Sequence, residues 1–158
     1  MKTAHRRAAQ HKRRWQKDPT AAFKLLGMAK PNEPGKLDTE HIECRVSFER
    51  LRDGGATEQD FDLVAHVLNS ALVRAEQIDE LLVETIKRGQ DAMVRMKDRY
   101  LRGLRFGFDA PGLRDVPAAL DAWEAMADAS SPLQLQHAIK EAYRRMTGGQ
   151  LLKLEDVQ

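Results

Sequence analysis

The sequence predicts an all-α fold, a bundle of about five helices preceded by a basic N-terminal arm. Three observations support this prediction. Apolar residues recur at helical spacing through most of residues 37–158. Helix start and stop signals separate these stretches, and positive charge gathers ahead of a proline-rich linker. With 158 residues, the chain is long enough to form one domain with its own core.

Charge divides the chain into two parts. Residues 1–36 contain ten Lys and Arg against two Asp and Glu, a net charge of +8, whereas residues 37–158 have a net charge of −6. Between them, PNEPGK (31–36) has the two prolines and the glycine of a linker. We therefore expect a basic arm over residues 1–30, either helical or disordered, followed by this linker and a helical bundle domain over 37–158. Such asymmetry is typical of a chain that meets nucleic acid or another polyanion.

The arm itself contains two predicted helical stretches. Residues 3–17 lack Pro and Gly and are rich in helix formers, and Pro19 interrupts them. Residues 20–29, TAAFKLLGMA, predict a short helix. Its main apolar side chains are Phe23, Leu25 and Leu26. Met28 offers an alternative start for the protein, in which case the basic stretch would be absent from the mature chain.

The first segment of the domain, HIECRVSFERL (41–51), fits two interpretations. As a strand, it alternates apolar and polar residues. The alternating apolar residues are Ile42, Cys44, Val46 and Phe48. As a helix, it presents one apolar face. The residues of that face are Leu37, His41, Cys44, Phe48 and Leu51. A lone strand would have no partner for its backbone groups. We therefore predict a helix, capped by Asp38 or Thr39 and ended by the DGG at 53–55.

Two long helices are predicted next. Thr57 and Asp60 approximate a capping box for the first of them. An unbroken helix from here to Arg102 would have about 45 residues, so we expect a break near Glu76–Asp79. The second helix carries one apolar stripe. The stripe consists of Ile78, Leu82, Ile86, Gly89, Met93, Met96, Tyr100 and Leu104. Gly89 either lets another helix approach closely or marks a kink.

Two further helices complete the predicted bundle. In the connection over 103–117, Phe106 and Phe108 are expected to enter the core, and Asp115 is expected to cap a helix that has Pro117 in its first turn. Ser131 and Gln134 form a capping box for the last helix, which Gly148-Gly149 should end. The expected apolar stripes are Val116, Leu120, Trp123 and Ala127, and then Leu135, Ile139, Ala142 and Met146.

The basic arm is the leading candidate for a binding site. On a helix its cations form a ribbon, and guanidinium groups bind phosphates bidentately. A tryptophan beside them can stack on an unpaired base or anchor the arm to the body. The candidate nucleic-acid-binding residues of the arm are Arg6, Arg7, Arg13, Arg14, Trp15 and Lys17. The alternatives are a passive, solvated tail and contact with a membrane surface.

A second basic cluster lies at 87–105. Its candidate nucleic-acid-binding residues are Arg88, Arg95, Arg99 and Arg102. Steps of 7, 4 and 3 residues place these side chains near one another on a helix. They either extend the phosphate-binding surface of the arm or pair with an acidic stretch. That stretch contains Glu76, Asp79, Glu80 and Glu84.

No constellation for catalysis, metal or cofactor binding is evident, so we expect a non-enzymatic protein without cofactors. His41 and Cys44 form an isolated pair, and zinc needs three or four ligands. Cys44 is the sole cysteine and reads as buried, which suits a cytoplasmic protein. No run of 18 apolar residues and no signal-peptide core occur, so we expect neither a membrane-spanning helix nor secretion, and we predict no membrane partner. The second function considered is a protein–protein interaction module, or a homodimer formed through the 78–104 helix.

Two resemblances accompany these patterns. In composition, residues 4–17 are similar to the arginine-rich helical peptides of phage antitermination proteins, which grip RNA hairpins and stack a tryptophan on a loop base. FERLRDGGATEQDFDLVAHVLNSALVRAEQ, followed by GFDAPG, resembles small, uncharacterised helical proteins of proteobacterial phages, prophages and genomic islands. This second resemblance covers residues 48–140 and implies a mobile-element setting. Its markers are Leu51, Gly54, Asp60, Leu68, Asn69, Ala75 and Glu76.

Overall fold

The computed structural model describes residues 35 and 37–153, and these residues contain five α-helices and no strand. The helices are α3 (Asp38–Asp53), α4 (Glu58–Ala75), α5 (Glu80–Leu101), α6 (Ala110–Asp128) and α7 (Pro132–Thr147). The predicted all-α fold is therefore confirmed. The basic arm predicted over 1–30 lies outside the described residues.

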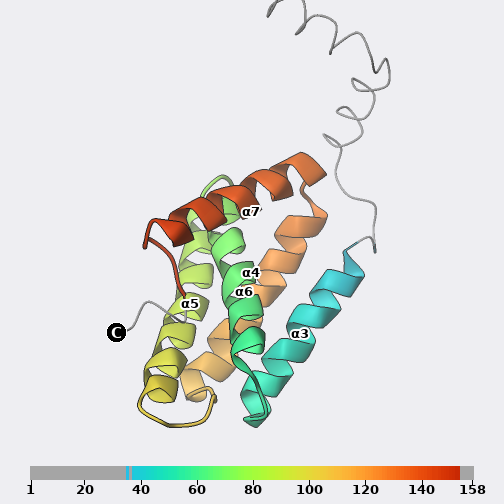
Figure 1. Cartoon of the computed structure of the whole chain (residues 1–158). Coiled ribbons are helices and arrows are strands. Elements are labelled where there is room, and N and C mark those ends of the chain that lie inside the picture. The colour runs from blue at the N-terminus through green and yellow to red at the C-terminus, as the bar shows by residue number, and fades with distance from the viewer. Residues whose placement is uncertain (1–34, 36, 154–158) are drawn as a thin grey trace, which may run out of the picture.

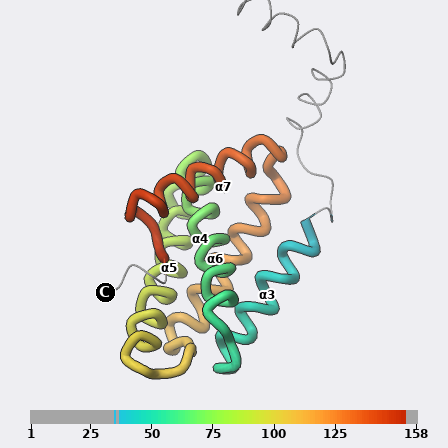
Figure 2. The backbone as a smooth tube through the Cα atoms, viewed as in Figure 1, coloured from blue at the N-terminus to red at the C-terminus, as the bar shows by residue number. Residues whose placement is uncertain are grey.

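Helix α4 is the centre of the bundle. It packs against each of the other four helices, and α5 and α6 also pack extensively against one another. Helix α3 lies at the edge of the bundle and packs mainly against α4, whereas α7 lies across one end (Figures 1 and 2). Among the described helices, none is long and apolar enough to cross a membrane.

The core forms along α4 and α5 with contributions from every neighbour. Its largest fully buried side chains include Leu51, Phe61, Leu68, Ile86, Met93, Met96 and Leu120. The loop after α5 adds Phe106, which stacks on Tyr100 with ring centroids 3.9 Å apart. Phe108 is partly buried and packs against Phe48, with ring centroids 5.2 Å apart. The expectation that both loop phenylalanines enter the core is confirmed.

The segment with two interpretations is a helix, α3, as predicted. Gly54 adopts φ +79° just after its last turn, a conformation that glycine reaches without a Cβ clash. The predicted cap is wrong, because Leu37 occupies the N-cap position without a side-chain hydrogen bond. Asp38 instead lies in the first turn, where its negative charge interacts favourably with the unpaired N–H groups.

The break between the two long helices is also confirmed. Helix α4 starts with the predicted capping box and ends at Ala75, and Asp79 caps α5 by accepting a 2.7 Å hydrogen bond from the Leu81 N–H. The apolar stripe of α5 is buried only in its middle. Ile78 is 47% exposed and Leu104 is 57% exposed, because both lie beyond the ends of the helix.

The predicted start of α6 is wrong. Asp109, and not Asp115, caps this helix by accepting a 2.8 Å hydrogen bond from the Gly112 N–H, and Pro111 lies in the first turn. Pro117 therefore lies inside the helix, where it has no N–H to donate. The sequence offers the pattern Asp-x-Pro twice, six residues apart. The earlier one begins the helix, which adds buried Gly112 to the face packed on α5.

The start and end of α7 agree with the prediction. Ser131 accepts from the Gln134 N–H at 3.3 Å, and the Gln134 side chain accepts from the Ser131 N–H at 2.9 Å. Gly148 forms the C-cap, followed by Gly149 at φ +73°. One residue of the expected stripe is misplaced, since Ile139 is 53% exposed. Helix α7 buries a narrow face against α4, and Ile139 lies outside it.

Gly89 provides the close approach of α5 and α6, one of its two predicted roles. A Cβ at this position would lie 2.7 Å from the Cβ of Ala119, which is closer than two carbon atoms can pack. We expect Gly89→Ala to lower the free energy of unfolding by about 1–2 kcal/mol, because overpacking outweighs the better helix propensity of alanine. Chemical denaturation of the full chain measures this change.

The matched control is the exchange of the two side chains. Ala119→Gly alone should cost about 1 kcal/mol, the usual effect of glycine within a helix. The double variant Gly89→Ala/Ala119→Gly should be close to the wild type, because the glycine is merely moved across the interface. Additive losses in the double variant would contradict the steric explanation.

Candidate nucleic-acid interface

The predicted interface falls in two regions, of which the structure describes one. The arm residues Arg6, Arg7, Arg13, Arg14, Trp15 and Lys17 lie outside the described residues. The second region is the α5 face that carries Arg88, Arg95, Arg99 and Arg102.

Helix α5 presents these four arginines on one side. Their spacing places them within a sector of about 60° around the helix axis. The buried residues of α5, such as Met93 and Met96, lie on another side and leave the arginines at its border. The α5 face defined by the four arginines therefore lies beside the loop that leads into α6.

Arg95 and Arg99 converge on one carboxylate, that of Asp109. Arg95 Nε lies 2.6 Å and Arg99 Nη1 lies 3.6 Å from Asp109 Oδ2. Arg99 also donates a hydrogen bond to the Gly107 carbonyl. The hydrogen bond from Arg95 is the main reason that the pKa of Asp109 is lowered to about 2, and it raises the pKa of Arg95. Asp109 is thus an anion held by two cations at the start of α6.

These contacts change the expected pairing of the cluster. The acidic stretch at 76–84 was the alternative partner, but Asp109 takes this role for two of the arginines. Glu76 instead receives both Nη atoms of Arg145 at 3.0 and 2.8 Å, which joins α7 to the end of α4. The sequence pattern missed Asp109, although an Asp two residues before a Pro is itself a helix-start signal.

Arg88 and Arg102 have a different setting. Both residues are exposed; Arg88 Nη2 lies 3.4 Å from the Thr85 hydroxyl, and Arg102 is the C-cap of α5. Exposed Asp91 and Asp98 lie on the same helix and dilute the positive potential. The α5 face can therefore offer guanidinium groups to phosphates at its two ends, while its middle already binds a carboxylate.

Asp109→Asn separates the structural and binding roles of the two central arginines. Asparagine is as good an N-cap as aspartate, but it removes the negative charge between the two guanidinium groups. We expect a loss of stability of up to about 1 kcal/mol and, if the α5 face contacts phosphates, a several-fold gain in affinity for single-stranded RNA. Fluorescence anisotropy at fixed salt measures the affinity. A fall in affinity, with the fold intact, would contradict a contribution of this face.

The cysteine and histidine residues form no site in the described part of the chain, where no group of three His, Cys, Asp or Glu side chains could hold a metal ion. Cys44 is buried, as predicted, and burial raises the pKa of its thiol to about 12. At neutral pH the thiol is protonated, and the thiolate is the nucleophilic form.

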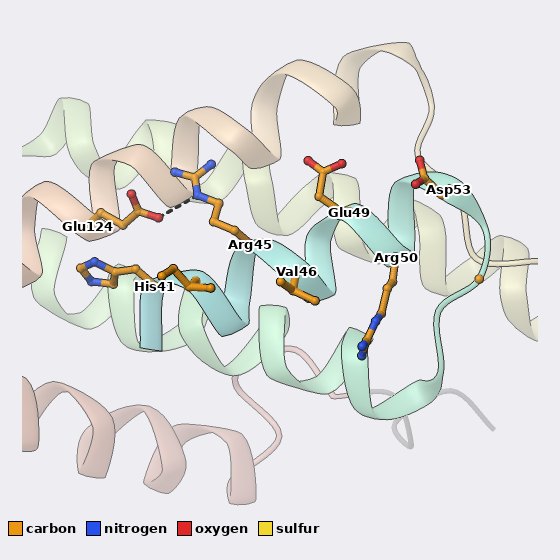
Figure 3. Close-up of a pocket in the computed structure, with 9 residues that line it drawn as sticks. His41, Arg45, Val46, Glu49, Arg50, Asp53 and Glu124 are labelled. Atoms are coloured by element: carbon orange, nitrogen blue, oxygen red, sulfur yellow. Dashed lines mark hydrogen bonds and ion pairs between the residues drawn. The ribbon is translucent and has the colours of Figure 1, made fainter. Parts of the chain in front are cut away.

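A groove on α3 was not foreseen. It has a volume of about 510 Å³ and follows the outer face of this helix (Figure 3). Its lining residues are His41, Ile42, Arg45, Val46, Glu49, Arg50, Asp53, Gly55 and Glu124. Ile42 is 61% exposed and Val46 is 44% exposed. In the strand interpretation these same residues belonged to the apolar face, which was the available signal that α3 has a second apolar side.

Ion pairs define the borders of the groove. Arg45 Nε lies 2.7 Å from Glu124 Oε1, and Arg45 also pairs with Asp121, so that α3 is tied to α6 (Figure 3). On the other side, Arg50 extends toward α4, and its Nη1 lies 3.2 Å from Asp60 Oδ1. The arginines of the groove are therefore held by carboxylates of neighbouring helices.

Comparison with protein-family models, with curated proteins and with solved structures finds no match to this chain.

Proposed function

We propose that the protein is a non-enzymatic nucleic-acid-binding protein that contacts phosphates through its basic N-terminal arm. The observation that supports this most is the division of charge, with +8 in residues 1–36 and −6 in the remainder. A cationic arm on an anionic body attracts a polyanion at one end only. An accessory or regulatory role in a mobile element, in the cytoplasm, is the use we propose for it.

The chemistry of the arm suits an extended phosphate backbone. Each neutralised phosphate releases condensed counterions, and this release supplies much of the affinity. Because such contacts do not read bases, binding should tolerate a change of nucleic-acid sequence. Trp15 adds a flat surface for stacking, which favours unpaired bases over a continuous duplex.

The α5 face supports this proposal in a secondary way. Arg88 and Arg102 are exposed and lie at its two ends, whereas Arg95 and Arg99 hold Asp109. We therefore assign phosphate contacts first to the arm and then to these two exposed arginines. Arg95 and Arg99 contact a phosphate only where it displaces the Asp109 carboxylate or binds beside it on the same guanidinium groups.

An electrophoretic mobility shift with three probes tests the proposal. Single-stranded RNA, duplex DNA and heparin are each added to the full chain at about 50 mM salt. We expect retention of all three probes, equal retention of a scrambled RNA, and displacement of RNA by heparin. Absence of any shift at this salt concentration would contradict the proposal.

A protein–protein interaction module or homodimer remains the alternative, with the arm as a passive tail. Exposed apolar residues on α5 favour it. They are Leu81, Val94 and Leu101, to which the following loop adds Leu104. Light scattering over a range of concentrations distinguishes the two: a monomer that shifts RNA supports the first proposal, and a dimer that shifts nothing supports the second.

A further inference from the structure

The groove on α3 combines exposed apolar side chains with an acidic setting. The apolar part consists of Ile42 and Val46, one turn apart. Helix α3 and the carboxylates paired to its arginines carry eight negative charges and three positive ones. The negative residues are Asp38, Glu40, Glu43, Glu49, Asp53, Asp60, Asp121 and Glu124. This surface therefore suits a short segment that is apolar on one side and positively charged around it.

We propose that this groove receives residues 20–29 of the same chain. This segment, TAAFKLLGMA, provides large apolar side chains at Phe23, Leu25 and Leu26, and it carries one cation, Lys24, and no anion. The proposal goes beyond the nucleic-acid function. It assigns an intramolecular docking site on the helical domain to residues 20–29 and leaves residues 4–17 to bind a polyanion.

The connection between the two partners has a suitable length. Residues 20–29 precede α3 by eight residues, 30–37, which span at most about 29 Å when extended. The groove follows α3 from His41 to Asp53, about 18 Å along the helix axis. Antiparallel neighbouring helices are commonly joined by two to eight residues, so the segment can fold back along α3.

Charge favours this occupant over a second copy of the described domain. In a symmetric dimer through the groove, the same acidic surface would face itself across the interface, and like charges repel. The segment that precedes α3 has the opposite charge. It is also tethered, so its effective concentration at the groove is in the millimolar range, well above that of a free partner.

Cysteine cross-linking tests the proposal on the full chain. In a Cys44→Ala background, Leu25→Cys/Val46→Cys brings one thiol from the segment to the exposed middle of the groove. The matched control is Ala9→Cys/Val46→Cys, whose first thiol lies farther from the groove along the chain. We expect mild oxidation to give a disulfide within one chain at least tenfold faster for the first pair, at a rate independent of protein concentration.

Three results would overturn the proposal. A rate ratio of about two, which loop closure alone gives for separations of 21 and 37 residues, would show that proximity in the chain and not docking brings the thiols together. A disulfide that joins two chains and forms faster at higher concentration would indicate a second copy in the groove. Failure of the Leu25→Cys/Val46→Cys pair to cross-link would indicate that the segment lies elsewhere.

A second variant keeps docking and nucleic-acid binding separable. Phe23→Ser/Leu26→Ser removes apolar contacts but retains all ten cations of residues 1–36. We expect amide hydrogen exchange in α3 to become at least fivefold faster, while the RNA shift persists. The control Ala8→Ser/Ala9→Ser should leave α3 unchanged. Unaltered exchange in α3 would overturn docking of the segment and leave the proposed function in place. If the wild-type protein does not shift RNA, the proposed function is overturned and docking is not.

Discussion

Replacing Arg6, Arg13 and Arg14 with glutamine is expected to weaken the binding of single-stranded RNA by about 100-fold at 0.1 M salt. On a single strand, each lost phosphate contact removes the release of about 0.7 counterions, and each counterion is worth about one decade of affinity at this salt concentration. The slope of log affinity against log salt should become less negative by about 2. Fluorescence anisotropy with labelled RNA measures both quantities.

The matched control removes three cations from the body. Arg52, Arg114 and Arg144 are exposed, and each pairs with a nearby carboxylate on the surface. Their replacement by glutamine changes the net charge by the same amount but should change the affinity by less than about threefold, because long-range charge effects are screened. Equal losses in the two triple variants would show that net charge, and not the arm, determines binding.

The Asp60→Ala variant is expected to lose about 3 kcal/mol of folding free energy, because it breaks a buried network between α3 and α4. The Asp60 carboxylate accepts hydrogen bonds from the Thr57 N–H at 2.9 Å and the Thr57 hydroxyl at 3.0 Å. It also accepts from the Ser47 hydroxyl at 2.9 Å and from Arg50 at 3.2 Å. Ser47 is buried, so its hydroxyl would be left without this partner. Denaturant unfolding monitored by circular dichroism measures the loss.

The Asp60 carboxylate also makes the stability of the wild-type protein depend on pH, and Asp60→Asn should remove this dependence. The Thr57 N–H is the main cause that lowers the pKa of Asp60 from 3.8 to about 2 in the folded protein. A lowered pKa stabilises the fold above about pH 4, and this contribution is lost as the pH falls through about 2. The difference in stability between wild type and Asp60→Asn should therefore shrink from pH 5 to pH 2. A difference that stays constant over this range would contradict the role of the charge.

Local signals in the sequence predicted most of the helix boundaries. The capping boxes at Thr57 and Ser131 each involve residues three apart, so their geometry is set within one turn. The break after Ala75 was inferred from helix length, and Asp79 supplies its cap. These features depend little on the rest of the molecule, which is why one sequence was sufficient to place them.

The start of α6 was not predictable in the same way. Asp109 and Asp115 each precede a Pro by two residues, and local rules do not choose between them. The choice depends on tertiary contacts, because Gly112 packs tightly on α5 and on the preceding loop: a Cβ there would lie 3.3 Å from the Cβ of Ala92 and 3.0 Å from Cδ1 of Phe108. The start of α6 also matters for the candidate site, because its N-cap, Asp109, is the carboxylate that pairs with Arg95 and Arg99.

The α5 face was largely predictable from the sequence, whereas the α3 groove was not. Helical spacing correctly placed Arg88, Arg95 and Arg99 on one helix, because periodicity determines which side chains share a face; Arg102 follows as the C-cap of that helix. It did not indicate which of them would be held by a carboxylate. The α3 groove escaped prediction because a helix with two apolar sides reveals which side is covered only when its neighbours are placed. Ile42 and Val46 became informative only through their exposure.

The most direct test of the central claim, that the charge of the arm serves to bind a polyanion, is a salt titration of RNA binding by the full chain. If the five cations Arg6, Arg7, Arg13, Arg14 and Lys17 contact phosphates, log affinity should fall against log salt with a slope of about −3.5 for a single strand and about −4.5 for a duplex. Between about 50 and 200 mM salt, the affinity should drop by at least about 100-fold. A slope near zero over the same range would contradict the account.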